Sequence, residues 1–457
     1  MDRKLPTNKR NEFGYRALLA VAVPLAATVG CFAITLFTDR TLLMWYEPTS
    51  SAASVSAGNL YWAVACIPVT TMGFITPLVA LAMGDRRNRG ATFGRVWSLL
   101  WQCVWLTIAS VPLFALIGWF SPQLFEAFGH EPDLATNESQ YFRTLLLVAP
   151  ASMLEAGLTA FFVGRRVTTP ILRSNIASAI LNVGLDFWLI FGGLGIPALG
   201  VFGAALATAV SMWFKVAVFA FLLVRLKSFG RHRLAVWRPN RKLIAEIVVP
   251  GSALGLQQLV RSSLFSLVLL IIGSASVTGL AATSAALSLY QLLSIPAIGL
   301  ATAVTVVVGQ GFASGGTNLA KKVMRQASVI GVVVAIAIAA VMLAFPGPLL
   351  QISLGGLDPI ERSEIEPLAI ILLRYAAVYC LVDVASLLLG AAAKGIGQTF
   401  ILLTATAIPG VIAVGWGWWY SPSDELVVTH WWSVLIVWAT LQATTIVFGI
   451  RREMRHA

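Results

Sequence analysis

Long apolar segments alternate with short polar connections along the whole chain. The segments lie near residues 14–45, 59–83, 95–120, 141–164, 170–192, 199–225, 243–273, 277–313, 324–352, 365–393, 398–419 and 428–450. Each is long enough for an α-helix to cross the hydrocarbon core of a bilayer, which takes about 20 residues. Apolar runs such as Val329–Phe345 suit helices better than the alternating strands of a barrel. The pattern predicts an all-α polytopic membrane protein with twelve transmembrane helices.

Composition and charge placement support a membrane protein and add an orientation. The chain of 457 residues is 58% hydrophobic and 11% charged, whereas a soluble chain carries about 25% charged residues. Basic residues gather in alternate connections, such as Arg86–Arg95 and Lys321–Arg325, and the other connections are acidic or neutral, such as Glu126–Glu138. This alternation follows the positive-inside rule. We therefore expect a multi-pass protein of the cell membrane with both termini in the cytoplasm, and no nucleic-acid partner despite the net charge of +12.

Landmarks in the first half of the chain recur in the same order in the second half. They are Val23-Pro24 with Val249-Pro250, Ile67-Pro68 with Ile295-Pro296, and a turn at Gly164–Thr169 with one at Lys394–Thr399. Six spans per repeat preserve orientation, so the two six-helix bundles should be parallel repeats related by a pseudo-two-fold axis along the membrane normal. The predicted domains are an N-lobe at 1–225, a basic cytoplasmic connection at 226–242 and a C-lobe at 243–457.

Polar residues within apolar spans are the candidates for chemistry in the N-lobe. Asn182 and Asp186 are four residues apart, which places both on one face of a helix. An ionised Asp in the middle of a spanning helix costs about 2.5–3.5 kcal/mol, so it needs a partner, a proton or water. Asp39 either faces Asp186 or reaches the interface at the end of its helix. If the two acids face each other, they share a proton or hold a cation, with Asn182 and Thr208 as neutral oxygen ligands or as ordinary interhelical hydrogen-bond partners.

Further polar residues in the spans have two interpretations each. Glu155 either pairs with a base such as Lys215 or lines a substrate cavity. Arg261 and Asp383 either form an ion pair or belong to the substrate site. The residues that we expect in the substrate cavity are Glu155, Met212, Gln257, Arg261, Tyr379 and Asp383.

Several motifs are missing from the sequence. The nearest stretch to a phosphate-binding loop, Gly309–Thr317, lacks the lysine, so ATP is not the evident energy source. The four cysteines fall in apolar spans without zinc spacing, and no cluster of nucleophile and base is recognisable. We therefore predict a transporter that is not an enzyme, with no cofactor and no metal other than Na⁺ at Asp39 and Asp186.

The chain resembles the multidrug and toxic compound extrusion (MATE) transporters. The resemblance is strongest at Leu194–Thr208, the connection between the fifth and sixth helices. It is supported by Asn182 with Asp186, by Gly164–Pro170 and by Val308-Gly309-Gln310. The resemblance implies two six-helix bundles around a central cavity.

The resemblance also implies roles for particular residues. In the DinF-like branch, the coupling site matches Asp39, Asn182, Asp186 and Thr208, and ion binding bends the first helix near its proline, here Pro24. In the NorM-like branch, a C-lobe cation site matches Tyr379 and Asp383, but Arg261 stands at the position of a glutamate. A fixed positive charge there would repel a cation, so the sequence combines DinF-like N-lobe features with a partly NorM-like C-lobe.

Together these features predict a cation-coupled antiporter. It would use H⁺ or Na⁺ to export organic, amphipathic or drug-like compounds by alternating access, and we expect a monomer in the lipid bilayer. The alternative is a lipid-linked sugar flippase of the same wider superfamily, which would need several basic residues in its cavity for pyrophosphate. A membrane-embedded enzyme and a passive channel rank below both.

Overall fold

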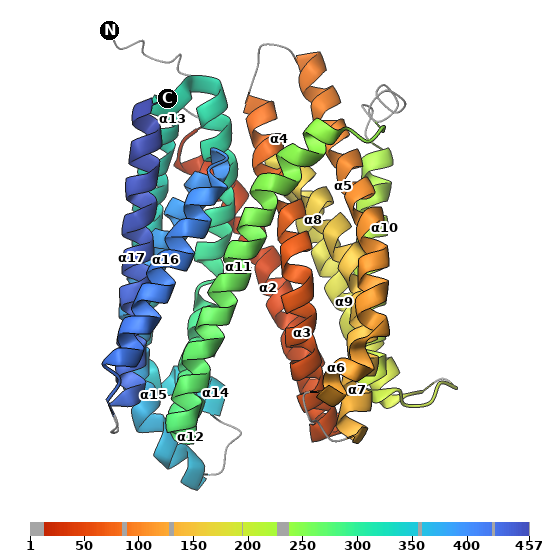
Figure 1. The fold of residues 1–457 in the computed structure, drawn as a ribbon, viewed down its shortest axis with the longest axis vertical. Coiled ribbons are helices and arrows are strands. Elements are labelled where there is room, and N and C mark those ends of the chain that lie inside the picture. The colour runs from red at the N-terminus through yellow and green to blue at the C-terminus, as the bar shows by residue number, and fades with distance from the viewer. Residues whose placement is uncertain are drawn as a thin grey trace. The chain divides into compact units, whose positions relative to one another are not determined.

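The computed structural model of the protein describes residues 13–84, 89–127, 132–193, 195–225, 237–354, 359–422 and 426–456, and apart from short connections these residues are helical (Figure 1). Within these residues, eleven helices are long and apolar enough to span a membrane, and Val277–Leu293 is a shorter apolar helix. The prediction of an all-α polytopic membrane protein is confirmed.

The chain packs into two compact units. Unit 1 contains Met1–Ala26 and Leu256–Ala457, and unit 2 contains Ala27–Gly255. The divisions fall inside helix α2 (Tyr15–Tyr46), shortly after Pro24, and inside helix α11 (Arg241–Ala275), shortly after Pro250. These two prolines are the equivalent landmarks of the proposed repeats. The predicted lobe boundary at 226–242 lies largely outside the described residues and stays a prediction.

Helix α8 lies at the centre of unit 2. Besides parts of α2 and α11, this unit contains α3 (Pro48–Gly73), α4 (Ile75–Gly84), α5 (Arg89–Trp119), α6 (Ser121–Ala127), α7 (Pro132–Leu146), α8 (Val148–Gly164), α9 (Thr169–Phe191) and α10 (Gly200–Val224). Helix α8 packs against α3, α4, α5 and α10, and α9 packs along α10. Side chains on α8 are therefore close to several other helices of the unit.

Helix α15 has the corresponding central place in unit 1. This unit contains α12 (Val277–Leu293), α13 (Ile295–Ala344), α14 (Pro346–Leu354), α15 (Pro359–Gly395), α16 (Thr399–Trp419) and α17 (Val427–His456). Helix α15 packs against α12, α13, α16 and α17. It carries Asp383 into the interior of the unit, where the carboxylate meets side chains from other helices.

Helix α13 consists of two helical segments. At 50 residues, a continuous helix would be about 75 Å long, far more than the membrane core of about 30 Å. Gly315 and Gly316 have non-helical backbone angles, and the φ of +65° at Gly316 lies in the left-handed region that favours glycine. Counting these segments separately raises the number of candidate spans in the described residues from eleven to twelve, and the break lies close to the predicted gap between 313 and 324.

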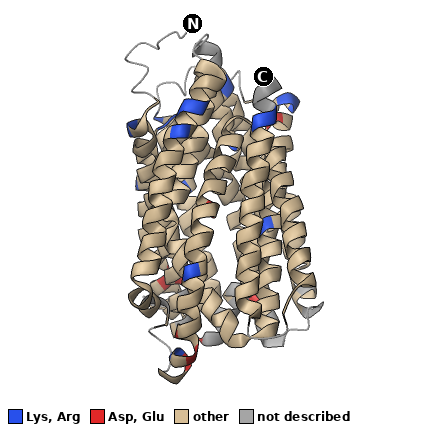
Figure 2. Ribbon diagram, turned by 90° about the vertical axis from the view of Figure 1, so that its left-hand side faces the viewer, with Lys and Arg blue, Asp and Glu red and all other residues tan. Residues whose placement is uncertain are grey.

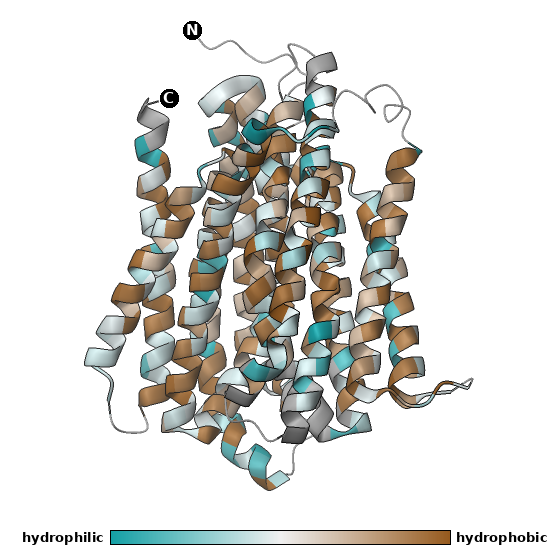
Figure 3. Cartoon of the chain, turned by 45° about the vertical axis from the view of Figure 1, so that its right-hand side comes forward, coloured by the Kyte–Doolittle hydropathy of each residue, from teal (hydrophilic) through white to brown (hydrophobic). Residues whose placement is uncertain are grey.

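Charged residues are concentrated toward the ends of the helices. In Figure 2 most Lys and Arg lie near one end of the helices, and most Asp and Glu lie near the other. Between the ends, the helices are largely hydrophobic along their length (Figure 3). The few charged and amide side chains within the spans are therefore costly exceptions whose partners need to be identified.

Candidate functional site

Four polar residues that the sequence singled out come together in unit 2. Asp39 is on the part of α2 that belongs to this unit, Asn182 and Asp186 are on α9, and Thr208 is on α10. Asp39 is 8% exposed, and Asp186 is fully buried. Of the two interpretations of Asp39, the structure shows the one in which this carboxylate turns toward the site on α9.

The Asn182 amide connects the two carboxylates. In the amide orientation that satisfies both neighbours, its nitrogen donates to Asp39 Oδ1 at 3.1 Å and to Asp186 Oδ2 at 3.3 Å. The Thr208 hydroxyl donates to Asp39 Oδ2 over 3.5 Å, which is a long contact. Two acids from helices far apart in sequence therefore share a single amide nitrogen.

Of the two acids, Asp186 has fewer of its hydrogen-bonding positions filled. Its second oxygen, Oδ1, is buried and has no hydrogen-bond partner among the described residues, and no described Lys or Arg forms an ion pair with it. A buried carboxylate without a counter-charge is expensive in a membrane, and taking up a proton or a cation removes that cost. The cluster, called here the Asp39–Asp186 site, has the groups needed to bind either.

The turn between α9 and α10 and the packing of these helices position the site. Gly193 and Ile196 exchange backbone hydrogen bonds of 2.9 and 3.0 Å. At Gly203, an added Cβ would lie 2.5 Å from the Leu189 carbonyl oxygen. Glycine at this position allows α10 to approach the backbone of α9 closely, which keeps Thr208 on the same side of the unit as Asn182 and Asp186.

An ion pair in unit 2 links α8 and α10. Lys215 Nζ lies 3.1 Å from Glu155 Oε1, and the Thr159 hydroxyl donates to the same oxygen at 2.8 Å. The pairing of Glu155 with Lys215 is thus present. Met212, three residues before Lys215, is half-buried, and its predicted place in a substrate cavity stays a prediction.

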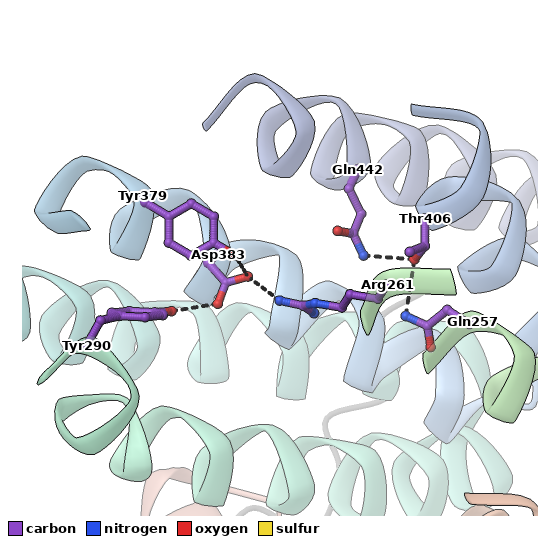
Figure 4. Close-up of polar contacts among 7 residues, drawn as sticks. All are labelled: Gln257, Arg261, Tyr290, Tyr379, Asp383, Thr406 and Gln442. Atoms are coloured by element: carbon purple, nitrogen blue, oxygen red, sulfur yellow. Dashed lines mark hydrogen bonds and ion pairs between the residues drawn. The ribbon is translucent and has the colours of Figure 1, made fainter. Parts of the chain in front are cut away.

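Asp383 in unit 1 accepts three hydrogen bonds (Figure 4). Arg261 on α11 donates to Oδ1 at 2.9 Å, Tyr379 donates to Oδ1 at 3.3 Å and Tyr290 on α12 donates to Oδ2 at 2.6 Å. The side chain of Asp383 is 12% exposed and that of Arg261 is 32% exposed. The guanidinium supplies the positive charge that this carboxylate needs, so a free cation has little to gain here.

Gln257, one turn before Arg261, belongs to a neighbouring hydrogen-bonded group. Its amide donates to the Thr406 hydroxyl at 3.1 Å, and the Gln442 amide donates to the same oxygen at 3.0 Å (Figure 4). Sequence reasoning missed Tyr290, Thr406 and Gln442. The available signal was their polarity inside apolar spans, but hydroxyl and amide groups are common there.

Two further predictions concern Pro24 and metals. Pro24 lies in the part of α2 that packs with unit 1, two residues before the division at Ala26; its role as a hinge stays a prediction.

Within the described ranges, no group of three or more His, Cys, Asp or Glu side chains is arranged to hold a metal ion. The Asp39–Asp186 site offers two carboxylates with amide and hydroxyl neighbours.

The sequence model of the MatE family matches residues 24–188 and 253–419. The chain belongs to the MATE family. The two matched segments have nearly equal length and begin close to Pro24 and Pro250, in agreement with the repeat inferred from the sequence. This MATE transporter is a multi-pass membrane protein and a secondary transporter, and MATE transporters use cation coupling.

Relatives and solved structures agree with this assignment. The chain is 28% identical over 406 residues to the probable multidrug resistance protein NorM of Burkholderia mallei, which covers 88% of this chain and 85% of the relative. It is 29% identical over 398 residues to the probable NorM of Bradyrhizobium diazoefficiens, covering 85% and 83%. The fold matches the outward-facing conformation of a multidrug resistance MATE family transporter of the MOP superfamily with a TM-score of 0.83, at 20% identity and over 96% of both chains.

Proposed function

We propose that this MATE transporter is an antiporter that exports small organic, amphipathic compounds from the cytoplasm in exchange for H⁺ or Na⁺. The names of the relatives, which are multidrug resistance proteins, support the substrate class. The charge distribution along the sequence supports an orientation with both termini in the cytoplasm of the cell membrane. The protein would act as a monomer.

The observation that carries the proposal is the pair of buried carboxylates that share one amide. Asp39 and Asp186 meet at the Asn182 nitrogen, and Asp186 Oδ1 has no partner in the described part of the chain. One proton or one Na⁺ at this site would neutralise a charge that the membrane interior penalises. Binding and release of that ion would favour different conformations of the site, which is the requirement for coupling.

The energy available from one coupled charge is sufficient. A membrane potential of 100 mV supplies about 2.3 kcal/mol per charge, and a gradient of one pH unit adds about 1.4 kcal/mol. Their sum supports a concentration ratio of several hundredfold for a neutral substrate, since every 1.4 kcal/mol corresponds to about tenfold. No second ion is needed for useful export.

The second acidic cluster supports a single coupling site. Arg261 and two tyrosine hydroxyls already occupy Asp383. Ion pairing also weakens the alternative of a lipid-linked sugar flippase. Arg261 pairs with Asp383 and Lys215 pairs with Glu155, so neither base is available to bind a pyrophosphate. Binding of a lipid pyrophosphate in preference to hydrophobic cations would reverse this order.

The proposal can be tested with purified protein in sealed vesicles loaded with ethidium as the substrate. A pH gradient and a Na⁺ gradient are imposed separately, with the membrane potential clamped. We expect either the pH gradient or the Na⁺ gradient to drive ethidium against its own concentration gradient. Dissipation of the driving ion gradient by an ionophore should stop this movement. Equal ethidium flux with and without both gradients would contradict the proposal and indicate a passive pathway.

A further inference from the structure

Unit 2 contains an apolar groove that is separate from the Asp39–Asp186 site. It has a volume of about 930 Å³ and lies among α5, α7, α8 and α10. Its walls are apolar except for Thr107 and Arg143, and the Thr107 hydroxyl donates to the Cys103 carbonyl of its own helix at 2.9 Å. None of the residues of the Asp39–Asp186 site, and neither Glu155 nor Lys215, lines it.

The groove opens between membrane-spanning helices with exposed apolar side chains. Val111 on α5, Leu147 between α7 and α8, and Trp213 on α10 all line it, and each is more than 40% exposed. The lining of α5 extends from Val104 to Trp119, about 22 Å along the helix axis. One leaflet of the hydrocarbon core is about 15 Å thick, half of the full core. The groove is therefore long enough for one acyl chain.

Arg143 provides a fixed positive charge at one end of this groove. Its Nε donates to the Gly118 carbonyl at 3.0 Å and to the Ser121 hydroxyl at 3.1 Å. These bonds hold the guanidinium beside the end of α5, and its terminal amino groups have no hydrogen bond or ion pair with another described residue. Trp119, in the same lining, is 74% exposed, as is typical of indoles near a lipid headgroup.

We propose that this groove binds an anionic phospholipid, with one acyl chain along α5 and α10 and the phosphate against Arg143. The apolar walls select a hydrocarbon chain, and a guanidinium is well suited to bind a phosphate through two parallel N–H bonds. A zwitterionic lipid also has a phosphate, but its own ammonium group offsets the attraction. A unit negative charge about 4 Å from the guanidinium gains about 1 kcal/mol in water, which corresponds to about a fivefold preference for an anionic lipid. The site is independent of the proposed transport mechanism.

Tryptophan quenching provides a direct test, because bromine atoms on an acyl chain quench an indole that they contact. The full-length protein is placed in phosphatidylcholine vesicles that contain a small fraction of brominated phosphatidylglycerol or, separately, brominated phosphatidylcholine. We expect the phosphatidylglycerol to quench with about fivefold higher apparent affinity than the phosphatidylcholine. Replacing both groove indoles, by Trp119→Phe and Trp213→Phe, should remove the additional quenching.

Variants separate the charge from the groove. Arg143→Gln should abolish the preference for phosphatidylglycerol, Arg143→Lys should retain most of it, and Arg451→Gln, at an exposed arginine of α17, should leave it unchanged. Ala115→Phe, which fills the groove at an exposed lining position, should reduce quenching by both lipids without a change at Arg143. Equal quenching by the two lipids in the unmodified protein, or a preference that survives Arg143→Gln, would overturn the proposal.

Discussion

At the scale of single residues, the two acidic clusters differ in how well each carboxylate is satisfied. Asp383 accepts hydrogen bonds from a guanidinium and two phenols, whereas Asp186 has a buried oxygen without a partner in the described residues. A carboxylate with a full set of donors is held in place. One that lacks donors gains most from an arriving ion. We therefore expect structural effects from changes near Asp383 and coupling effects from changes near Asp186.

Arg261→Ala should lower stability, because it leaves Asp383 buried without its counter-charge. Loss of one partner from a buried pair costs about 3–5 kcal/mol and from an exposed pair about 0–1 kcal/mol. The partial exposure of Arg261 places this variant between the two, at about 1–3 kcal/mol. The matched control is Arg362→Ala, which removes an ion pair within one helix whose acid, Glu366, is 29% exposed against 12% for Asp383. Equal shifts of the two thermal unfolding midpoints in detergent would contradict the structural role of Arg261.

Tyr290→Phe should be more destabilising than Tyr379→Phe, because their hydrogen bonds to Asp383 differ in length. The Tyr290 contact is 2.6 Å and the Tyr379 contact is 3.3 Å, and a hydrogen bond to a charged group contributes about 1.5–3 kcal/mol. Each substitution removes one hydroxyl and preserves the ring, so packing changes little. The unfolding midpoints of both variants should be measured side by side, and a larger shift for Tyr379→Phe would argue against the observed geometry.

At the scale of elements, the close packing of α9 and α10 holds the Asp39–Asp186 site together. Gly203→Ala would place a methyl group 2.5 Å from the Leu189 carbonyl oxygen, so the helices must separate and Thr208 must move from Asp39. The control is Gly184→Ala on α9, where an added Cβ has no neighbour within 4 Å. We expect Gly203→Ala to reduce both stability and ion-driven efflux, and Gly184→Ala to be neutral or stabilising by up to about 1 kcal/mol. Similar behaviour of the two variants would show that this contact is unimportant.

The sequence was informative about elements but less so about their partners. Apolar runs predicted the spanning helices, and the spacing of four residues correctly placed Asn182 with Asp186 on one face of α9. Tyr290 and Gln442 were missed because their roles depend on which helices pack together, and a single hydroxyl or amide in a span does not reveal its neighbour. The division of α2 and α11 between two compact units was also missed, since a helix that is apolar along its length gives no sign of where its packing partner changes.

At the scale of the whole molecule, the two compact units differ in their polar interiors. The family match covers both halves, and α8 and α15 have similar central places in their units. Yet Asp383 forms an ion pair with Arg261, whereas no Lys or Arg in the described part of the chain forms an ion pair with Asp186. We infer that ion coupling is confined to unit 2 and that the polar cluster of unit 1 is structural or contacts substrate.

The most direct measurement is ion-driven ethidium efflux by Asp39→Asn and Asp186→Asn proteins in vesicles, together with ethidium binding to the same preparations. Glu246→Gln is the matched control, because Glu246 is an exposed acid that pairs with Arg95 away from the site. We predict that both aspartate variants bind ethidium normally but transport it only at the rate of protein-free vesicles, while Glu246→Gln remains active. Full gradient-driven efflux by either aspartate variant would contradict the assignment of the coupling ion to Asp39 and Asp186.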